Sequence, residues 1–545
     1  MRRRTEPTVE QLHTDDAREA IRGGDTALGI ELGSTRIKAC LTTLGGEVIA
    51  AGGHEWENSL ENGLWTYPLD AVHDGLRAAY ADLAADVERR FSVSLDRVGA
   101  IGVSAMMHGY LAFDAEGKLL VPFRTWRNVN TARAAAALSD ALEVNIPLRW
   151  SVAHLHQAVL DGEEHVARVD RVTTLAGYVH ELLTGERILG VGDASGMFPI
   201  DPETGDYDAG MLAVADGLIH GAGAAHLRLA DLLPRVRRAG EAAGRLSDDG
   251  ARLLDPSGTL ASGAVAGPPE GDAGTGMVAT NAVTPRTGNV SAGTSIFSMV
   301  VLERPLGSRH EEIDIVTTPA GDPVAMVHCN NGASEIGEWA GVFREFARAL
   351  GAEASADEVF TALLSGALER GADDGLLAYN HLSGEPIAGL DEGRPVIART
   401  PSSTLSLGGL MRAQVRGSFA TLSLGMRTLA DEGVAIDDMR AHGGVFRTAG
   451  VAQRLLAEAL GAPVTVGETA GEGGAWGMAV LAAYTRACAD SEQPVLADWL
   501  NEHIFAGDQT TTIAPEPDDV ADHAAYLDRW SAGLAIERAA VTAMP

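Results

Sequence analysis

The stretch GIELGSTRIKACLTT, Gly29 to Thr43, has a counterpart much later in the chain, GNVSAGTSIFSMVV, Gly288 to Val301. When the two are aligned on a glycine, Gly33-Ser34-Thr35 corresponds to Gly293-Thr294-Ser295. An apolar residue precedes each glycine, and an isoleucine follows it after four residues in the first stretch and three in the second. Both stretches predict a strand, a glycine turn and a second strand. We therefore expect the chain to build the same short hairpin twice.

Length and charge limit what such a repeat can mean. A chain of 545 residues is too long for one compact core, so we expect two large domains. The net charge of −33 disfavours partners such as nucleic acid or an anionic membrane surface. A small phosphorylated ligand stays compatible with this charge, because a nest of backbone N–H groups can hold an anion inside an acidic protein.

The cysteines and the first residues favour a cytoplasmic protein. Cys40, Cys329 and Cys488 are far apart and lack the spacing of metal ligands, which is typical of a reducing compartment. Residues 1–25 contain basic residues but no apolar segment after them, so we expect no secretory signal. No later segment is long and apolar enough to predict a membrane span. We interpret residues 1–25 as an N-terminal extension that forms a helical arm.

The order of predicted elements indicates an α/β protein whose pattern restarts after Gly288. Residues 240–269 are rich in Gly, Ser and Pro, which favours loops near a domain junction. We divide the chain into an N-terminal domain at 26–280, a C-terminal domain at 281–490 and a C-terminal helical extension at 491–545. The patterns predict strands within 26–52, 97–106 and the second hairpin, and helices at 70–91, 131–143, 334–350, 356–368, 451–461 and 473–487.

A glycine hairpin of this kind can bind phosphate. Glycine tolerates positive φ and leaves backbone N–H groups uncovered, and neighbouring Ser and Thr hydroxyls add donors. A single Gly-Ser-Thr is most simply a turn. Two such hairpins, one opening each half of the chain, favour a nucleotide cleft in which each contacts the phosphates from its own side.

At this point the sequence resembles the FGGY family of carbohydrate kinases, from about Thr26 to Ala487. The two hairpins look like the family's first and second phosphate motifs. Further segments agree in order: AIGVSAMMHGYLAFDAEGKLL, EGDAGTGMVAT, LAYNHLSGEP, GLMRAQVRGSFATL, HGGVFRTAGVAQRLLAEALGAPV and EGGAWGMAVLAAY. The resemblance implies two actin/hexokinase-like (ribonuclease H-like) domains, each a mixed β-sheet flanked by helices, with the active site in the cleft between them. It also implies ATP, Mg²⁺ and a small sugar as ligands.

The resemblance implies roles for residues near the phosphates. Asp272 matches the catalytic base that phosphoryl transfer to an alcohol requires, although by its spacing alone it would be a turn aspartate. Thr294 matches the threonine that contacts the transferring phosphate. The remaining nucleotide contacts would be Gly33, Ser34, Thr35, Lys38, Gly293, Ser295, Gly443 and Gly444. By itself Lys38 would be a solvated lysine, and the two glycines at 443 and 444 would also form a helix-entry turn.

Glu31 departs from the family pattern, which usually has aspartate at this place near the metal. Glutamate keeps the charge but places it one methylene further out. Contact with Mg²⁺ can then pass through a water molecule, which this ion readily keeps. The exact position of the metal therefore stays open.

The predicted sugar contacts combine two segments. Met107, His108 and Gly109 resemble the Met-His-Gly segment of xylulokinases, although a histidine at a strand end is more often structural. Trp126 is also kept, but Asn128 and Asn130 replace an aspartate and an arginine of that pattern. An amide can still donate to and accept from sugar hydroxyls. Xylulose, ribulose and another ketopentose all remain open as substrates. In the family pattern Asp193 and Ser195 would line the same pocket.

Two other functions remain as alternatives to a kinase. An actin-like or chaperone-like ATPase would share both hairpins but lack a sugar pocket, and a catalytically silent sugar-binding regulator would keep the fold. His154 and His156 have no partner cluster for zinc, and the glycines near 221 do not make a dinucleotide fingerprint, so a dehydrogenase is not expected. For the kinase, the expected partners are sugar and ATP, without nucleic acid or membrane, and a homodimer is compatible with them.

Overall fold

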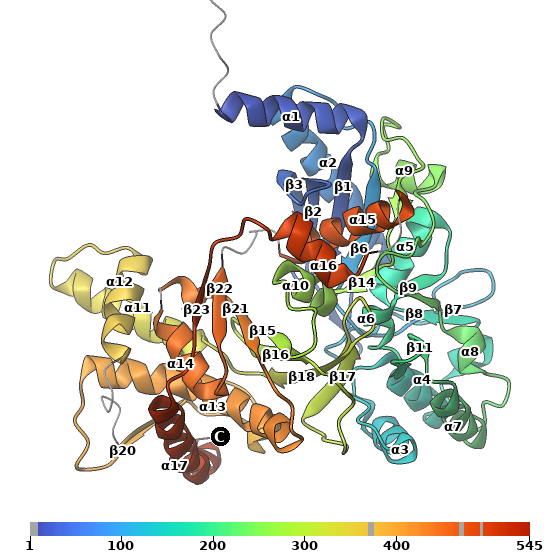
Figure 1. The fold of residues 1–545 in the computed structure, drawn as a ribbon. Coiled ribbons are helices and arrows are strands. Elements are labelled where there is room, and N and C mark those ends of the chain that lie inside the picture. Colours follow the sequence, from blue (N-terminus) through green and yellow to red (C-terminus); the bar gives the residue numbers. More distant parts are fainter. Residues whose placement is uncertain (1–8, 369–374, 449, 468–472, 491–493, 545) are drawn as a thin grey trace, which may run out of the picture. The chain divides into compact units, whose positions relative to one another are not determined.

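The computed structural model describes residues 9–368, 375–448, 450–467, 473–490 and 494–544, and it divides the chain into two compact units (Figure 1). Unit 1 comprises 1–283, 315–323 and 470–507, and unit 2 comprises 284–314, 324–469 and 508–545. The predicted domains were continuous blocks, whereas both units are discontinuous. The difference arises because a helix from the late part of the chain packs against the first strands.

Unit 1 is built on a mixed sheet, which has six strands in the described part of the chain. Its order is β13-β6-β1-β2-β3, with β14 also paired to β6. The first three strands form an antiparallel meander, and β6 runs parallel to β1. The bounds are β1 (Thr26–Leu32), β2 (Arg36–Thr43), β3 (Val48–Glu55), β6 (Ala100–Ala105), β13 (Val265–Ala266) and β14 (Glu270–Gly271). The smaller strands are β4 (Ser59–Glu61), β5 (Leu64–Thr66), β7 (Leu111–Phe113), β8 (Arg171–Thr173), β9 (Ile188–Gly190), β10 (Ile200–Asp201), β11 (Asp206–Tyr207) and β12 (Arg235–Arg237).

Helices cover this sheet. Helix α2 packs on β3, while α15 packs on β1 and β6 and also contacts α10. The segment 240–269, predicted as loops, contains the short helix α9, whose N-cap Ser247 accepts a hydrogen bond from Gly250 N. The helices are α1 (Val9–Gly23), α2 (Leu69–Phe91), α3 (Ala132–Leu142), α4 (Ser151–Leu160), α5 (Leu175–Thr184), α6 (Val191–Ala194), α7 (Ala209–Gly221), α8 (Leu229–Leu232), α9 (Asp248–Leu254), α10 (Asp272–Ala279), α15 (Gly474–Asp490) and α16 (Leu496–Trp499).

The contact between α15 and the sheet depends on small residues. A Cβ atom at Gly29 of β1 would lie 2.1 Å from the Ala475 carbonyl oxygen and 2.4 Å from Ala479 N. A Cβ atom at Gly477 of α15 would lie 2.3 Å from the carbonyl oxygen of Thr275 in α10. Both positions therefore require glycine, since backbone atoms cannot move aside as a flexible side chain can.

Unit 2 repeats the strand pattern of unit 1. The seven-stranded sheet of the described residues has the order β17-β18-β16-β15-β21-β22-β23. Strands β15, β16 and β18 form an antiparallel meander, and β21 runs parallel to β15, as β6 does to β1. The bounds are β15 (Thr287–Ala292), β16 (Ile296–Val301), β17 (Ile313–Thr317), β18 (Pro323–Cys329), β21 (Asp438–His442), β22 (Val464–Gly467) and β23 (Thr510–Ile513), with a separate pair β19 (Leu376–Tyr379) and β20 (Val396–Arg399).

The last helix of the chain is integrated into the core of unit 2. Trp530 on this helix is fully buried, and its indole Nε1 donates to the Ala378 carbonyl oxygen at 2.9 Å. Glu537 Oε2 and His381 Nδ1 form a hydrogen bond of 2.8 Å, and both side chains are fully buried. Through these side chains the helix Pro517–Ala543 is part of the unit 2 core. The helices of unit 2 are α11 (Ser334–Ala349), α12 (Ala356–Ser365), α13 (Leu407–Asp431), α14 (Val451–Leu460) and α17 (Pro517–Ala543).

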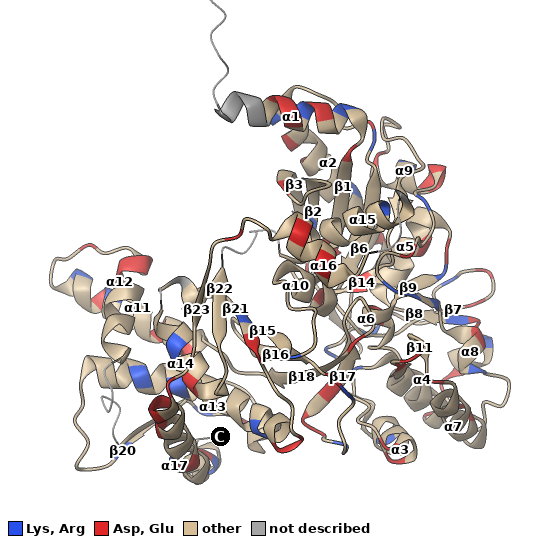
Figure 2. Ribbon diagram, in the orientation of Figure 1, with Lys and Arg blue, Asp and Glu red and all other residues tan. Residues whose placement is uncertain are grey.

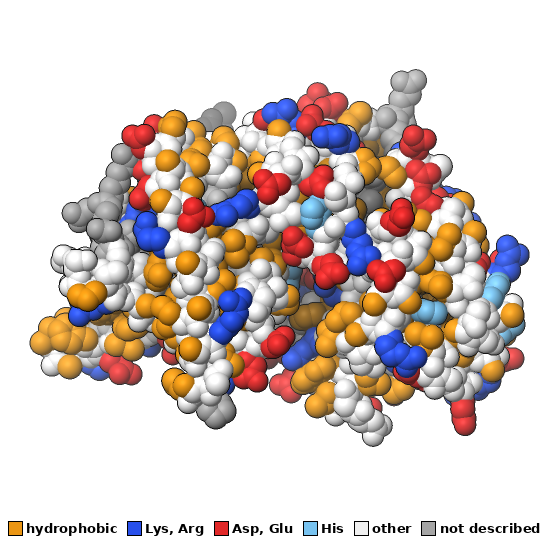
Figure 3. All heavy atoms as spheres, turned by 90° about the horizontal axis from the view of Figure 1, so that it is seen from below, with side chains coloured by type: hydrophobic (Ala, Val, Ile, Leu, Met, Phe, Trp, Pro, Cys, Tyr) orange, Lys and Arg blue, Asp and Glu red, His pale blue; other side chains and the backbone are white. Residues whose placement is uncertain are grey.

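Charges of both signs are distributed along the described elements of each unit (Figure 2). On the described part of the face in Figure 3, Lys and Arg side chains lie scattered among Asp and Glu side chains and do not merge into a continuous basic surface. Among the helices that the structure describes, none combines the length and the apolar character needed to cross a membrane.

The packing of α15 predicts a large effect of one methyl group. Gly29→Ala places its Cβ against two backbone atoms of α15, so we expect a loss of about 2 kcal/mol or more in the free energy of unfolding. Urea unfolding followed by circular dichroism measures this loss.

Gly217→Ala is the matched control, because a Cβ atom at Gly217 of α7 has open space around it. Alanine there favours the helix, so stability should stay equal or rise by up to about 1 kcal/mol. Equal stability of the Gly29 and Gly217 variants would contradict the proposed importance of the α15 contact.

Candidate active site

The first hairpin turns its carbonyl groups toward the protein. The Gly33 carbonyl oxygen accepts from Trp56 Nε1 at 2.7 Å, and the Ser34 carbonyl oxygen accepts from the Tyr67 hydroxyl at 2.6 Å. The Thr35 carbonyl oxygen accepts from Trp56 N at 3.1 Å. Within the described part of the chain, the N–H groups of Ser34 and Thr35 have no hydrogen-bond acceptor. The carbonyls are satisfied, and the two amides stay available to an anion.

The second hairpin has the same arrangement. The carbonyl oxygens of Gly293 and Thr294 accept from Ala333 N at 2.8 Å and Gly332 N at 2.7 Å. Among the described residues, the N–H groups of Thr294 and Ser295 have no acceptor. The turn is one residue shorter than the first, because the last strand pair is Ala292 with Ile296, whereas in the first hairpin it is Leu32 with Ile37.

Both turns are accessible to a ligand. Thr35, Gly293 and Thr294 are exposed, while Gly33, Ser34 and Ser295 are partly exposed. Two neighbouring free amides with hydroxyl side chains form a small anion-binding surface without any basic residue. Each unit therefore carries one surface suited to phosphate oxygens.

Gly443 lies directly behind the second hairpin. It has φ of +125° and a Cβ atom there would lie 2.1 Å from the Ala292 carbonyl oxygen, so both its conformation and its space require glycine. Gly444 begins a 3₁₀ turn (Gly444–Arg447) and has open space around its Cβ position. The pair brings an uncovered stretch of backbone next to the phosphate-binding turn of unit 2.

Asp272 is the first residue of α10 and is exposed. Its Oδ1 accepts from Met107 N at 3.3 Å and from Ala273 N at 3.0 Å. Surrounding protein desolvates the carboxyl group, and this together with the charge of Glu31 raises the pKa of Asp272 to about 6. Although these groups disfavour the charged form, the residue surface stays open to water, so a ligand can reach the carboxylate. Such a group is suited to accepting a proton near neutral pH.

Glu31 faces Lys38 across the first hairpin, with its Oε2 3.4 Å from the lysine Nζ. This is an ion pair rather than a hydrogen bond, and Oε2 is buried without a hydrogen-bond partner in the described residues. A buried carboxylate oxygen without a hydrogen-bond partner among the described residues, on the strand that leads into the first hairpin, fits a contact to a Mg²⁺–phosphate complex, since Mg²⁺ is held by one or two carboxylates together with substrate phosphates. The described residues contain no group of three or more His, Cys, Asp or Glu that could hold a metal by themselves.

Two carboxyl groups near Asp272, those of Glu270 and Asp193, are fully buried. Glu270 accepts from Asp193 N at 3.1 Å and from Gly192 N at 3.4 Å, and Asp193 Oδ2 accepts from the Thr174 hydroxyl at 2.6 Å. Burial, with smaller effects from neighbouring carboxylates, raises the pKa of Glu270 to about 8 and of Asp193 to about 7. Asp193 Oδ1 is buried without a partner among the described residues.

Glu270 was not predicted from the sequence. The signal in the sequence was indirect. It lies in two distant glycines, Gly190 and Gly192, at which Cβ atoms would lie 2.2 and 2.3 Å from the Glu270 carboxyl oxygens. The predicted Ser195 is buried, donates to the Gly192 carbonyl oxygen at 2.6 Å and accepts from Thr317 N at 3.1 Å. Its hydroxyl therefore fixes local backbone.

The Met107-His108-Gly109 segment follows β6 and has unusual backbone. His108 has φ of +67° and Gly109 of +92°. The His108 ring is buried, lies 3.2 Å from the Gly196 carbonyl oxygen through Nδ1 and stacks on Trp150. Met107 is buried too, and its backbone N–H contacts Asp272. A left-handed histidine is uncommon, and such conformations cluster at ligand-binding sites.

The second predicted sugar segment divides into one accessible and one buried residue. Trp126 is exposed, with 37% of its surface accessible. Asn128 is buried, and its amide binds backbone: Oδ1 accepts from Trp65 N at 2.9 Å, and Nδ2 donates to the carbonyl oxygens of Trp65 at 2.8 Å and Thr125 at 3.1 Å. Both amide hydrogens are thus used within the protein.

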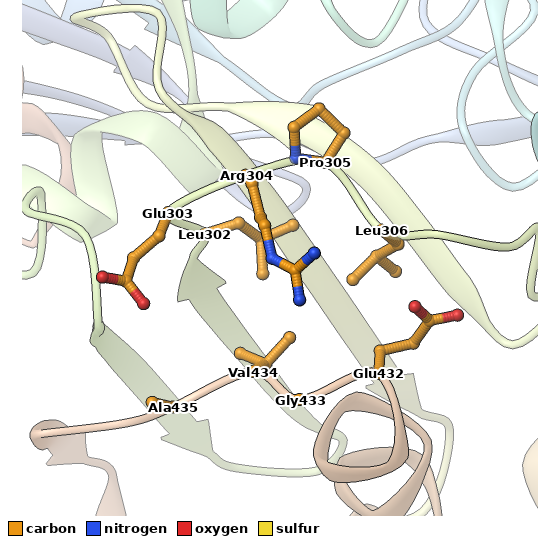
Figure 4. Close-up of a pocket in the computed structure, with 9 residues that line it drawn as sticks. All are labelled: Leu302, Glu303, Arg304, Pro305, Leu306, Glu432, Gly433, Val434 and Ala435. Carbon is orange, nitrogen blue, oxygen red and sulfur yellow. The ribbon is translucent and has the colours of Figure 1, made fainter.

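Unit 2 also has a pocket, lined by residues 302–306 and 432–435 (Figure 4). Arg304 points into it between the two segments, and Glu432 accepts from Gly307 N at 2.9 Å. None of the predicted site residues lines this pocket. The structure therefore brings Glu31, Lys38, Met107, Asp193 and Asp272 together in unit 1, and Thr294 with Gly443 in unit 2.

Comparison with known proteins matches two family domains in order along the chain. Residues 26–264 match the N-terminal domain of the FGGY family of carbohydrate kinases, and residues 288–486 match its C-terminal domain. Xylulose kinase from Klebsiella pneumoniae is 27% identical over 196 residues, which are 35% of this chain and 40% of that enzyme's length. The match thus spans well under half of the curated relative.

Solved structures share the fold over nearly the whole chain. A xyloylose kinase from Brucella ovis has a TM-score of 0.74 at 21% identity, covering 93% of this chain and 98% of that one. A gluconate kinase from Lactobacillus acidophilus has a TM-score of 0.72 at 16% identity, covering 93% and 96%. The two actin/hexokinase-like domains that the family resemblance implied are confirmed as the fold. With both family domains matched in order, the chain belongs to the FGGY family of carbohydrate kinases.

Proposed function

We propose that this protein is an ATP-dependent sugar kinase that transfers the γ-phosphate to a hydroxyl of a small sugar, most simply a ketopentose such as xylulose or ribulose. The observation that supports it best is the duplicated hairpin, in which the carbonyls are satisfied and two neighbouring amides are free. Family membership supplies ATP as the phosphate donor.

In this proposal the two hairpins bind phosphate oxygens through the amides and hydroxyls of Ser34, Thr35, Thr294 and Ser295. Lys38 would contribute positive charge beside the first hairpin, and the backbone at Gly443 and Gly444 would accommodate adenosine. Donors that are fixed before the reaction stabilise the charge on the transferring group at little reorganisation cost.

Asp272 would act as the general base. It accepts the proton of the attacking sugar hydroxyl as the oxygen–phosphorus bond forms and the bond to the ADP oxygen breaks. Met107 N holds one carboxylate oxygen, so the other can face the sugar. His108, Gly109 and Trp126 would form the sugar pocket around it, while Asp193 is fully buried.

Mg²⁺ would be held at Glu31 together with the phosphates, where it neutralises phosphate charge. The buried Oε2 without a hydrogen-bond partner among the described residues supports this assignment. We favour a contact through water, because the family's usual aspartate and this glutamate then serve the same purpose.

The substrate class is tested by a panel of pentuloses, hexuloses, polyols and sugar acids in a coupled assay of ADP release. We expect the highest kcat/KM on a five-carbon keto sugar, because the Met107-His108-Gly109 segment and Trp126 resemble those of xylulokinases. Clear preference for glycerol or gluconate would refute the ketopentose assignment. ADP release that no sugar stimulates would instead favour an actin-like or chaperone-like ATPase.

The role of Asp272 is tested by Asp272→Asn. Removal of a general base lowers turnover by roughly 10²- to 10⁴-fold. ADP affinity, measured by calorimetry, should stay near that of the unmodified protein, because the phosphate contacts lie on the hairpins. A variant that kept more than about half of kcat would exclude Asp272 as the base.

The metal role of Glu31 is tested with a pair of variants. Glu31→Gln removes the charge, so kcat should fall and the Mg²⁺ concentration for half-activity should rise. Glu31→Asp withdraws the charge by about 1.5 Å, the length of one C–C bond, which a rearranged water shell can absorb. We therefore expect the Asp variant to stay active with modestly altered Mg²⁺ dependence.

Titration of Mg²⁺ at saturating ATP and sugar distinguishes the alternatives. An Asp variant as damaged as the Gln variant would indicate direct coordination, since Mg²⁺ demands near-ideal octahedral distances. A Gln variant that behaved like the unmodified protein would remove Glu31 from the metal site.

A further inference from the structure

We propose that Asn128 is a positioning residue for the sugar pocket, and that it does not contact the sugar itself. This inference rests on the proposed kinase function. It starts from the three hydrogen bonds of the Asn128 amide, which all go to backbone of Trp65 and Thr125. The side chain is 3% exposed, so its polar atoms face the protein and not a ligand.

The bonds attach one loop to one hairpin. We call residues 124–131 the Trp126 loop, because this tryptophan is its exposed predicted sugar contact. The hairpin consists of β4 and β5, joined through Asn62 and Gly63, which both have positive φ. Thr125 N also donates to the Trp65 carbonyl oxygen at 3.2 Å, so the loop continues the edge of β5. Asn128 thus binds both the backbone N–H and the backbone carbonyl group of Trp65.

A neighbouring contact strengthens the same junction. The Arg127 guanidinium lies 3.7 Å from the centre of the Trp65 ring, a cation–π distance, and Arg127 Nη1 donates to Asn58 Oδ1 at 3.3 Å. Asn58 Nδ2 in turn donates to the Tyr67 hydroxyl at 3.4 Å.

The network ends at the first phosphate hairpin. The Tyr67 hydroxyl donates to the Ser34 carbonyl oxygen, and the Tyr67 ring stacks on Trp56 at 4.2 Å between centres. Trp56 donates to the Gly33 carbonyl oxygen. A continuous set of hydrogen bonds and ring contacts therefore leads from the Trp126 loop to the turn that offers free amides to phosphate. The Trp126 loop and the first phosphate hairpin are thus both attached to the segment around β5. In the proposed function this would keep the sugar at a constant distance from the phosphates, as in-line transfer requires.

The chemistry explains why an amide occupies this position. Asparagine can accept from Trp65 N and donate to two carbonyl oxygens at once, whereas an ionised aspartate only accepts. An aspartate at position 128 would lose both donated bonds and place a carboxylate against two carbonyl oxygens in a buried place. The aspartate of the xylulokinase pattern therefore does not suit this pocket.

The decisive variant is Asn128→Asp, because the two interpretations predict opposite results. If Asn128 positions the Trp126 loop, aspartate should raise the sugar KM about tenfold or more, as expected when a buried group loses its hydrogen bonds. ADP affinity should stay within about twofold, because the Tyr67 and Trp56 contacts to the hairpin remain. If residue 128 instead contacts sugar directly, aspartate should bind the hydroxyls as well as or better than asparagine.

Asn62→Asp is the matched control. It makes the same chemical change in the same hairpin, at an exposed turn position whose backbone aspartate also tolerates. Sugar KM, kcat and ADP affinity should all stay unchanged in this variant.

Hydrogen exchange of the peptide containing residues 124–131 supplies a measurement independent of turnover. We expect faster exchange in Asn128→Asp and unchanged exchange in Asn62→Asp. An unchanged or lower sugar KM in Asn128→Asp, with sugar-stimulated ADP release intact in the unmodified protein, would refute the positioning role alone. Absence of any sugar stimulation in the unmodified protein would refute the proposed function together with this inference.

Discussion

The backbone contact between α15 and β1 is the constraint on which unit 1 depends. Gly29 leaves room for the Ala475 carbonyl, and Gly477 leaves room for that of Thr275. One helix is thereby packed against both the strand that contains Glu31 and the helix that begins at Asp272. Because proteins are close-packed, a fixed helix between these two elements also fixes the separation of the two carboxylates. Helix α15, from the late part of the chain, thus packs against both elements that carry the candidate site carboxylates.

The repeat noticed in the sequence corresponds to a repeat in topology. In both units the glycine turn lies in an antiparallel meander. The first strand of each meander also pairs with a parallel strand on its other side, β6 in unit 1 and β21 in unit 2. In both turns the carbonyls are hydrogen-bonded inward, so the amides remain for a ligand. In the proposed function, this arrangement would let a chain with a net charge of −33 hold phosphate, because fixed backbone dipoles do not depend on net charge.

The sequence was sufficient to predict both hairpins and the helices after them, because these follow from local periodicity and turn chemistry. It was not sufficient for contacts between distant segments. Glu270 has no local pattern of its own and becomes visible only once the glycines at 190 and 192 are seen to surround it. Asn128 was predicted as a sugar contact from its place in the motif, and the sequence alone does not show that its amide is buried and bonded to backbone. Helix α9 was missed because its few residues lie within a segment rich in glycine and serine.

The three carboxyl groups at and near the candidate base differ in their exposure to solvent, and their pKa values differ with it. Glu270 and Asp193 are fully buried, and their pKa values are raised further than that of the exposed Asp272. Protonation of the buried groups reduces the repulsion that several carboxylates would otherwise exert on one another. The carboxyl group with the least raised pKa, that of Asp272, belongs to the one residue of these three that is exposed. The hydrogen bonds that the Glu270 carboxyl group accepts hold the backbone of α6, the short helix that carries Asp193.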